Sequence, residues 1–430
     1  MSEDGVKFDR DIQIDAPNSI TRFEVKNLFL RNLTYTIEFP ASLTGKGEPS
    51  LLILSGPNGG GKTTILRMID GMLNWDFDLF RRVPFERAAL TLSSGDRLEI
   101  TKTQDKAFPL FASFGGNSAF MSAKKGQGYP QDKDAAREHL RELALPVLKT
   151  VKFELLDIHR SIALRSGDLN SDEVDEILIR SEMRRRGYPE VRDLTKVLSS
   201  QVKRFVQEAQ VNYRKYFEAE QLALLPRILN RLEKTDRPTK DALRVVLEKS
   251  RESAPMLKRM GLYTDDQDET DLIDLLSNNE RYEDPASLAV FEAYVEMQQN
   301  KAQTRALIAN RLENFERIMA EFLDGKVVQI DAKSGLKITA GAAELSETSL
   351  SSGEYHFLCM MVTALLCLRA GTIIAIDEPE MSLHVTWQRK VVDALTLCAA
   401  GASPLFVFAT HSSAISAEHS DRVVKLGTIE

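Results

Sequence analysis

Cysteine is scarce in this chain of 430 residues, which contains three. Cys359, Cys367 and Cys398 all lie in apolar stretches. Secreted disulfide-rich domains and structural zinc sites need several cysteines in closely spaced sets, so both are excluded. We expect all three to be small core residues of a protein in a reducing compartment.

Long hydrophobic runs are also missing. The longest, Phe357 to Leu368, ends at Arg369 and is too short to cross a bilayer. The first 18 residues are polar and acidic, unlike a secretory signal peptide. We therefore expect a cytoplasmic protein that makes no use of a membrane.

An excess of positive charge is the third absence, because the net charge is −7. Proteins that grip DNA constitutively are usually basic, so DNA binding is left uncertain. The strongest basic cluster, Arg180 with 184–186, is either a solvated helix face or a contact for nucleic acid or an acidic partner. With 43% apolar and 28% charged residues, the chain is typical of soluble globular proteins and long enough for two or three domains.

A glycine-rich segment near the N-terminus predicts a phosphate-binding loop. It follows an apolar run, Ser50 to Ser55, that indicates a buried strand, and it precedes a predicted helix, Thr63 to Trp75. Strand, loop and helix in this order are the context that a P-loop requires. The alternative, a glycine-rich turn that matches by chance, is opposed by the motifs described next. The predicted ATP ligands are Asn58, Gly59, Gly60, Gly61, Lys62, Thr63 and Thr64.

Within this loop, Lys62 would reach the β- and γ-phosphates and the Thr63 hydroxyl would hold Mg²⁺. A second buried run, Ile373 to Ile376, ends in Asp377 and Glu378. Asp377 would bind Mg²⁺ through water, and Glu378 would position or deprotonate the attacking water. The alternative is a solvated acidic turn, which would not explain the ordered run of Glu380, Ser382 and His384 that follows.

His411 follows a third apolar strand, Leu405 to Ala409, and could contact the γ-phosphate. A single histidine after a strand is more often structural, but its spacing from the acidic pair favours a role in the site.

Two further segments resemble a known family. Leu350-Ser-Ser-Gly-Glu354 is similar to the signature of ABC-type ATPases, and the run from Asp377 to Gln388 resembles the OLD/RecF/SMC-like branch. That branch includes ATPases of bacterial anti-phage systems such as PARIS, Septu and retron-associated modules. The resemblance covers about residues 21–104 and 326–426. It implies an α/β fold, an ABC-type P-loop ATPase head of mixed sheet and helices.

The resemblance also implies a mechanism, in which two heads sandwich two ATP molecules. Ser351 and Gly353 of one chain would bind the γ-phosphate held by the other, and Ser382 to His384 would lie at the same seam. Arg31 could stack on adenine or be a solvated turn residue.

One expected feature is missing: these ATPases carry a glutamine that senses Mg²⁺ and the γ-phosphate. Gln104 comes too early, and the better-placed strand at 151–157 offers Asp157, His159 or Arg160 as the sensor, or merely a polar strand end.

The expected domains are a tail at 1–20, a head N-terminal lobe at 21–132 and a head C-terminal lobe at 326–430. A mainly helical insertion fills 133–325, with the strand near 151–157 returning to the head. Apolar stripes starting at Val202 and Ile308 predict a short antiparallel helical hairpin. The segment 111–132, rich in Gly, Ser and Lys, is expected to be a long loop.

The function that the resemblance implies is a slow, switch-like ATPase. It would assemble as a head dimer or a larger homo-oligomer and control a separate effector, such as a nuclease, in defence against phage, after a phage trigger. A separate chain is expected because no nuclease domain follows His411. The alternative is a RecF-like ATPase of DNA repair or chromosomes.

Overall fold

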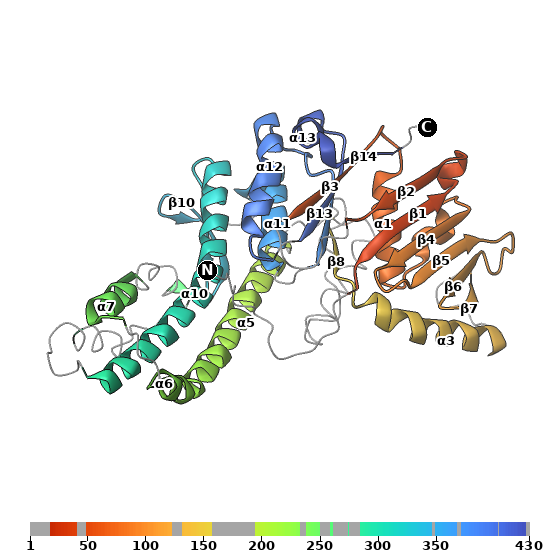
Figure 1. Cartoon of the computed structure of the whole chain (residues 1–430). Coiled ribbons are helices and arrows are strands. Elements are labelled where there is room, and N and C mark those ends of the chain that lie inside the picture. The colour runs from red at the N-terminus through yellow and green to blue at the C-terminus, as the bar shows by residue number, and fades with distance from the viewer. Residues whose placement is uncertain are drawn as a thin grey trace. The chain divides into compact units, whose positions relative to one another are not determined.

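A computed structural model describes residues 18–40, 49–122, 131–156, 194–232, 238–249, 259–260, 274, 284–345, 349–367, 371–402 and 404–426. The chain forms two compact units. The head unit comprises Asp9–Pro189 and Leu350–Glu430, and the helical unit comprises Glu190–Ser349 with the first eight residues. Figure 1 shows the elements of each. No described helix is long and apolar enough to cross a membrane.

The first sheet of the head unit has six antiparallel strands in the order β2-β1-β4-β5-β6-β7. Its strands are β1 Ile20–Lys26, β2 Thr34–Glu38, β4 Arg87–Leu92, β5 Arg97–Lys102, β6 Leu110–Phe114 and β7 Asn117–Met121. Buried and exposed residues alternate along these strands, so one face is apolar and the other polar. The alternation of residues at 23–26 and 33–39 and the turn residues 94–96 predict two of these strands and the β4–β5 hairpin, and the structure confirms them.

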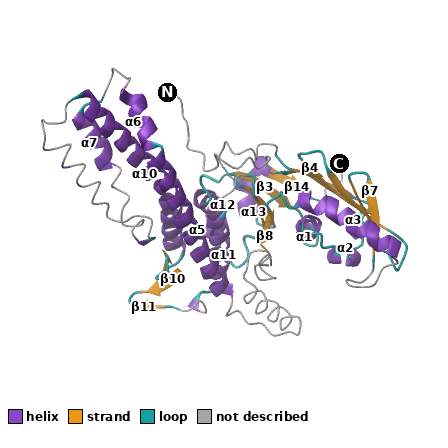
Figure 2. Cartoon of the chain, turned by 90° about the horizontal axis from the view of Figure 1, so that it is seen from below, coloured by secondary structure: helices purple, strands orange, loops and turns teal. Residues whose placement is uncertain are grey.

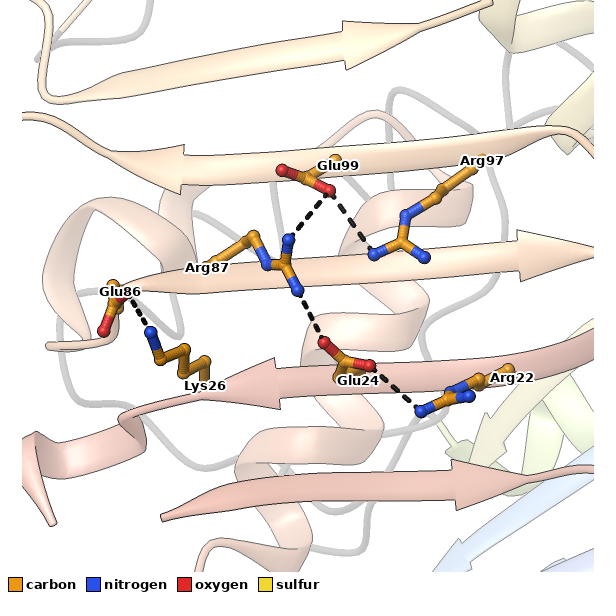
Figure 3. A network of polar contacts seen from close by, with 7 residues as sticks. All are labelled: Arg22, Glu24, Lys26, Glu86, Arg87, Arg97 and Glu99. Carbon is orange, nitrogen blue, oxygen red and sulfur yellow. Dashed lines mark hydrogen bonds and ion pairs between the residues drawn. The ribbon is translucent and has the colours of Figure 1, made fainter. Parts of the chain in front are cut away.

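The polar face carries a ladder of ion pairs across β1, β4 and β5 (Figure 3). Arg87 bridges Glu24 at 2.7 Å and Glu99 at 3.7 Å. Arg22 and Arg97 extend the ladder at its two ends. Exposed pairs of this kind contribute at most about 1 kcal/mol each, so the ladder mainly keeps this face of the sheet polar.

The segment 111–132 was expected to be a loop, and this is wrong for its first part. Residues 110–114 and 117–121 pair as the β6–β7 hairpin, joined at Gly115 and Gly116. Both glycines have positive φ, 56° and 82°, as a tight hairpin turn requires. The small residues Ala112 and Ala119 hide the alternation that marks a strand.

The second sheet of the head unit is fully parallel, in the order β14-β3-β13-β12-β8. Its strands are β3 Ser50–Ser55, β8 Phe153–Leu156, β12 Ile373–Asp377, β13 Leu405–Thr410 and β14 Val423–Lys425. The strands predicted from the three apolar runs are confirmed, and they are neighbours. Their carboxyl ends therefore bring the phosphate loop, the acidic pair and His411 to one edge.

Helix α1, Lys62–Leu73, begins at the phosphate loop and lies between the two sheets (Figure 1). Its buried side chains, among them Ile65, Ile69 and Met72, join the apolar faces of both sheets in one core. On the other side of the parallel sheet lie α11 Ser352–Leu366, α12 Val385–Cys398 and α13 Ser413–Glu418. The three cysteines are buried and free, as expected.

The helical unit is built on α5, Leu194–Leu222, and α10, Pro285–Phe322 (Figure 2). The two run antiparallel, because Ser199 near the start of α5 lies against Gly335 just after α10, whereas Glu220 near its end contacts Asn300. The predicted stripes face inward: Val202 and Val206 are buried, as are Leu312, Phe315 and Met319. The shorter helices α6 Leu224–Leu232 and α7 Lys240–Lys249 pack on α10.

Residues 326–349 differ from the expected C-terminal lobe of the head. The strands β9 Val327–Asp331, β10 Gly335–Ala340 and β11 Ala343–Glu344 form a separate three-stranded sheet that belongs to the helical unit. Glu316 of α10 accepts a hydrogen bond from Ile330 N at 2.7 Å and ties the sheet to the helix. The helical unit therefore extends to Ser349 rather than 325.

Candidate nucleotide site

The phosphate loop joins the end of β3 to the start of α1 and depends on its glycines. Gly59 and Gly61 have φ of 71° and 97°, which only glycine adopts freely. A Cβ on Gly61 would lie 2.9 Å from Leu28 Cδ2, and one on Gly60 would lie 2.8 Å from Pro57 O. The loop is thus held in a tight curl at a helix N-terminus, the arrangement that suits a phosphate.

Lys62 is buried and reaches back over the loop. Its Nζ donates to Gly56 O at 2.9 Å and to Pro57 O at 3.2 Å, and it lies 3.2 Å from His411 Nδ1. Burial lowers the pKa of the Lys62 ammonium, and the carboxylates of Glu378, Glu380 and Asp377 oppose part of that shift. The carbonyl oxygens of Gly56 and Pro57 hold the Lys62 ammonium at a point where oxygens of a bound phosphate could replace them.

Thr63 and Asp377 meet across the site. The Thr63 hydroxyl donates to Asp377 Oδ1 at 3.0 Å, and Asp377 is 6% exposed. A hydroxyl and a carboxylate at this distance are hard oxygen ligands of the kind that Mg²⁺ prefers. The two residues that the sequence predicts as magnesium ligands therefore fit that ion.

Glu378 and His411 lie side by side at the open edge of this group. His411 Nε2 is 3.8 Å from Glu378 Oε1, and both side chains are about a third exposed, at 30% and 37%. Glu378 has a positive φ of 52°, unusual for a residue other than glycine. This strained backbone places a carboxylate next to solvent at the end of β12.

The predicted signature lies at the start of α11. Ser351 is the exposed N-cap residue, and its Oγ accepts from Glu354 N at 3.3 Å while Ser351 N donates to Glu354 Oε2 at 2.6 Å. This is a capping box, so Ser351 and Glu354 have a local role in starting the helix. This role was not predicted, although the spacing Ser-x-x-Glu is a sequence signal for it.

Gly353 has a packing role within its own chain. A Cβ at this position would lie 2.2 Å from Ser382 O, so only glycine allows α11 to approach the turn after β12. Ser382 is exposed and has a φ of 61°. The predicted seam residues Gly353 and Ser382 thus touch each other.

Other predicted residues lie apart from this group or outside the described residues. Arg31 is exposed, with its guanidinium 5.7 Å from the ring centroid of Phe29, which borders Gly61. Asn58 is exposed at the tip of the loop. The proposed sensors Asp157, His159 and Arg160, and the cluster at Arg180 and 184–186, lie outside the described residues.

Two residues next to the site carried no assigned role in the sequence analysis. The Glu380 carboxylate accepts from the backbone N–H groups of His411 and Ser412. His356 of α11 is buried, and its Nδ1 donates to Met381 O at 2.9 Å. No motif marks His356, because its contact is to a backbone carbonyl far away in sequence.

Among solved structures, the chain is similar to an Smc head domain with an extended coiled coil bound to the C-terminal domain of ScpA, from Pyrococcus furiosus. That match has 14% identity, covers 93% of this chain and 91% of the other, and has a TM-score of 0.39. A second, an SmcHead bound to the C-winged helix domain of ScpA, has 11% identity, the same coverage and a TM-score of 0.35.

No curated protein matches the chain. A family model does, over residues 145–417, and it is described as "AAA domain, putative AbiEii toxin, Type IV TA system". The matched range includes the acidic pair, the signature and His411, and it begins after the phosphate loop. Since the match covers more than half of its residues, the chain belongs to this family of AAA domains.

Proposed function

We propose that this protein binds ATP with Mg²⁺ and hydrolyses it. One observation carries the proposal: five side chains from three separate strand ends converge at one edge of the parallel sheet. Thr63 lies 3.0 Å from Asp377, Lys62 lies 3.2 Å from His411, and His411 lies 3.8 Å from Glu378. A cradle of backbone amides, a buried ammonium, hard oxygen ligands and an exposed carboxylate together suit phosphoryl transfer to water.

Each group has a task that its surroundings support. Lys62 and the amides of Gly59 to Gly61 would hold the β- and γ-phosphates, and Asn58 and Thr64 would complete the loop. Thr63 and Asp377 would hold Mg²⁺, which neutralises charge on the phosphates when it is bound. Arg31 would lie against adenine.

Glu378 is proposed as the residue that acts on water. Its partly exposed carboxylate can accept a hydrogen bond from the attacking water and take up its proton. His411, between Lys62 Nζ and Glu378 Oε1, would contact the γ-phosphate and keep both neighbours in place. The sensor position is assigned to Asp157 or His159.

The site is proposed to work between two copies. The 15-residue helix α11 offers its N-terminus, with Ser351 exposed, as a ready anion site. Because this helix end is exposed, we assign it to the γ-phosphate held by a second copy. ATP would then join the heads, and hydrolysis would release them.

The biological role is proposed as control of a separate effector in anti-phage defence. The description of the family names a toxin of a type IV TA system, which supports a role for the chain in such a system. The head dimer, or a larger homo-oligomer, would respond to a phage trigger and change its hold on the effector, such as a nuclease, in the cytoplasm.

The test of the enzymatic proposal is phosphate release from ATP with Mg²⁺. We expect slow turnover by the wild type, no ATP binding by Lys62→Ala, and binding without turnover by Glu378→Gln. Glu418→Gln serves as the control, because it removes the same charge from a side chain that is 44% exposed, and it should match the wild type. Turnover in Glu378→Gln equal to the wild type would reject Glu378 as the base. ATP turnover that depends on added DNA would favour a role in DNA repair or chromosomes.

A further inference from the structure

The turn that follows β12, residues 378–383, is unusually constrained. Glu378 at its start and Ser382 near its end have positive φ although neither is glycine. Such conformations cost about 1–2 kcal/mol each. Three backbone hydrogen bonds hold it: Glu378 N to Ala409 O at 2.8 Å, Met381 N to Glu378 O at 2.9 Å and Leu383 N to Glu380 O at 3.0 Å. A strained turn fixed this tightly defines the position of what is attached to it.

On one side the turn is attached to the segment that carries His411. Glu380 Oε1 accepts from His411 N at 2.6 Å and from Ser412 N at 3.1 Å. Gln388 adds a second link, since its side chain donates to Leu383 O at 3.0 Å and accepts from the Ser412 hydroxyl at 2.7 Å. The backbone of His411 is therefore held by the residue two positions after Glu378.

On the other side the turn is attached to the start of α11. His356 Nδ1 donates to Met381 O at 2.9 Å, one helical turn after Gly353. Gly353 itself lies against Ser382 O, where a Cβ would come within 2.2 Å. The first turns of α11 thus contact two consecutive carbonyl groups of the turn, Met381 O through a hydrogen bond and Ser382 O through close packing.

We propose that Glu380 is a positioning residue that holds His411 in register with Glu378, and that the turn it stabilises links these two residues to the signature helix of the same chain. The inference rests on the proposed ATPase function. Its consequence is that one rigid turn couples two regions of the head. These are the site that would hold ATP and the helix end that would contact a second copy.

A carboxylate is the group that this position requires. Two backbone N–H groups converge on a single oxygen, and an ionised acceptor binds both more strongly than a neutral amide oxygen does. Among the described residues no group donates to the other oxygen, Glu380 Oε2, although it is buried. A buried carboxylate oxygen without a donor is costly, and this cost is consistent with a side chain kept for position rather than for stability.

The experiment compares Glu380→Ala and Glu380→Gln with the wild type and with Glu418→Gln, a charge-matched control on α13. The measurements are kcat and KM for ATP hydrolysis, ATP affinity by equilibrium binding, and melting temperature. Because the phosphate loop is untouched, we expect ATP affinity within about threefold of the wild type. We expect kcat to fall about 100-fold in Glu380→Ala, since a misplacement of about 1 Å costs that much. Glu380→Gln should recover part of the rate.

The outcomes separate the two claims. A wild type that neither binds nor hydrolyses ATP contradicts the proposed function itself. An active wild type with unchanged kcat in Glu380→Gln and Glu380→Ala overturns the positioning role. If Glu380→Ala does not fold, Glu380→Gln decides alone: a folded variant with a lowered kcat and normal ATP affinity supports the role, and a normal kcat rejects it.

Discussion

At the scale of single residues, the proposed site combines side chains that would bind ATP with side chains that hold the backbone around them. Lys62, Thr63, Glu378 and His411 follow buried strands and Asp377 ends one, and parallel strands bring their carboxyl ends together. Glu380 and His356 were given no role from the sequence because they bind backbone groups. A pattern of side chains does not show which carbonyl or amide group will lie opposite them. The positive φ of Glu378 and Ser382 is likewise invisible, since neither is glycine.

The pH dependence of stability tests the burial of His356. Burial lowers the pKa of its imidazole, and the hydrogen bond to Met381 O and the Glu380 carboxylate oppose only part of that. Below about pH 6.5 the unfolded chain therefore binds a proton that the folded chain does not, and the free energy of unfolding falls, by up to about 1.4 kcal/mol per pH unit, until the folded pKa is reached. His356→Asn should flatten this dependence in urea unfolding between pH 7 and 5.

The control for that measurement is His139→Asn, because His139 is exposed on α3, Gln131–Leu148. Its curve should parallel that of the wild type. Parallel curves for His356→Asn and the wild type would mean that the His356 imidazole has the same pKa in the folded and the unfolded chain, against the effect of its burial.

Because Gly353 packs against Ser382 O, adding a single methyl group at this position should destabilise the fold. Gly353→Ala should lower the free energy of unfolding by about 1–3 kcal/mol, because the added Cβ must displace backbone. Ser352→Ala, one residue earlier and exposed, is the matched control and should change stability by less than about 0.5 kcal/mol. An equal, small effect of both variants in urea unfolding would show that the turn and α11 are not in tight contact.

At the scale of elements, predictability followed the strength of the pattern. The apolar runs of β3, β12 and β13 and the stripes of α5 and α10 were predicted, because burial on both faces or along one stripe leaves a clear period. The β6–β7 hairpin was missed because the small residues Ala112 and Ala119 stand at buried positions where large apolar residues usually mark a strand. The sequence at 327–330 and 336–339 indicates the strands β9 and β10 but not β11. The attachment of their sheet to α10 depends on the hydrogen bond from Ile330 N to Glu316, which no sequence period reveals.

The packing of α10 against α5 gives a prediction for the hairpin. Phe315 is fully buried in the predicted stripe, so Phe315→Ala should lower the free energy of unfolding by about 3–5 kcal/mol. Glu321→Ala, at an exposed position of the same helix, should change it by less than about 0.5 kcal/mol. Denaturant unfolding of both variants checks this. A cost below 1 kcal/mol for Phe315→Ala would place Phe315 outside the core.

At the scale of the whole molecule, the sequence indicated an α/β head interrupted by a helical segment, and the structure has both. The expected boundaries at 133 and 326 differ from those of the compact units, because α3 belongs to the head unit and β9 to β11 belong to the helical unit. A boundary depends on which surface a strand covers, and that information is not local.

The claim that matters most for the whole molecule is that ATP joins two heads around the site. Native mass spectrometry of Glu378→Gln with ATP and Mg²⁺ tests it most directly, because it counts chains and nucleotides in one particle. We predict particles with equal numbers of chains and ATP molecules and at least two of each. Ser351→Arg in the same background should give single chains that still hold ATP. Single Glu378→Gln chains, with or without ATP, would contradict the account.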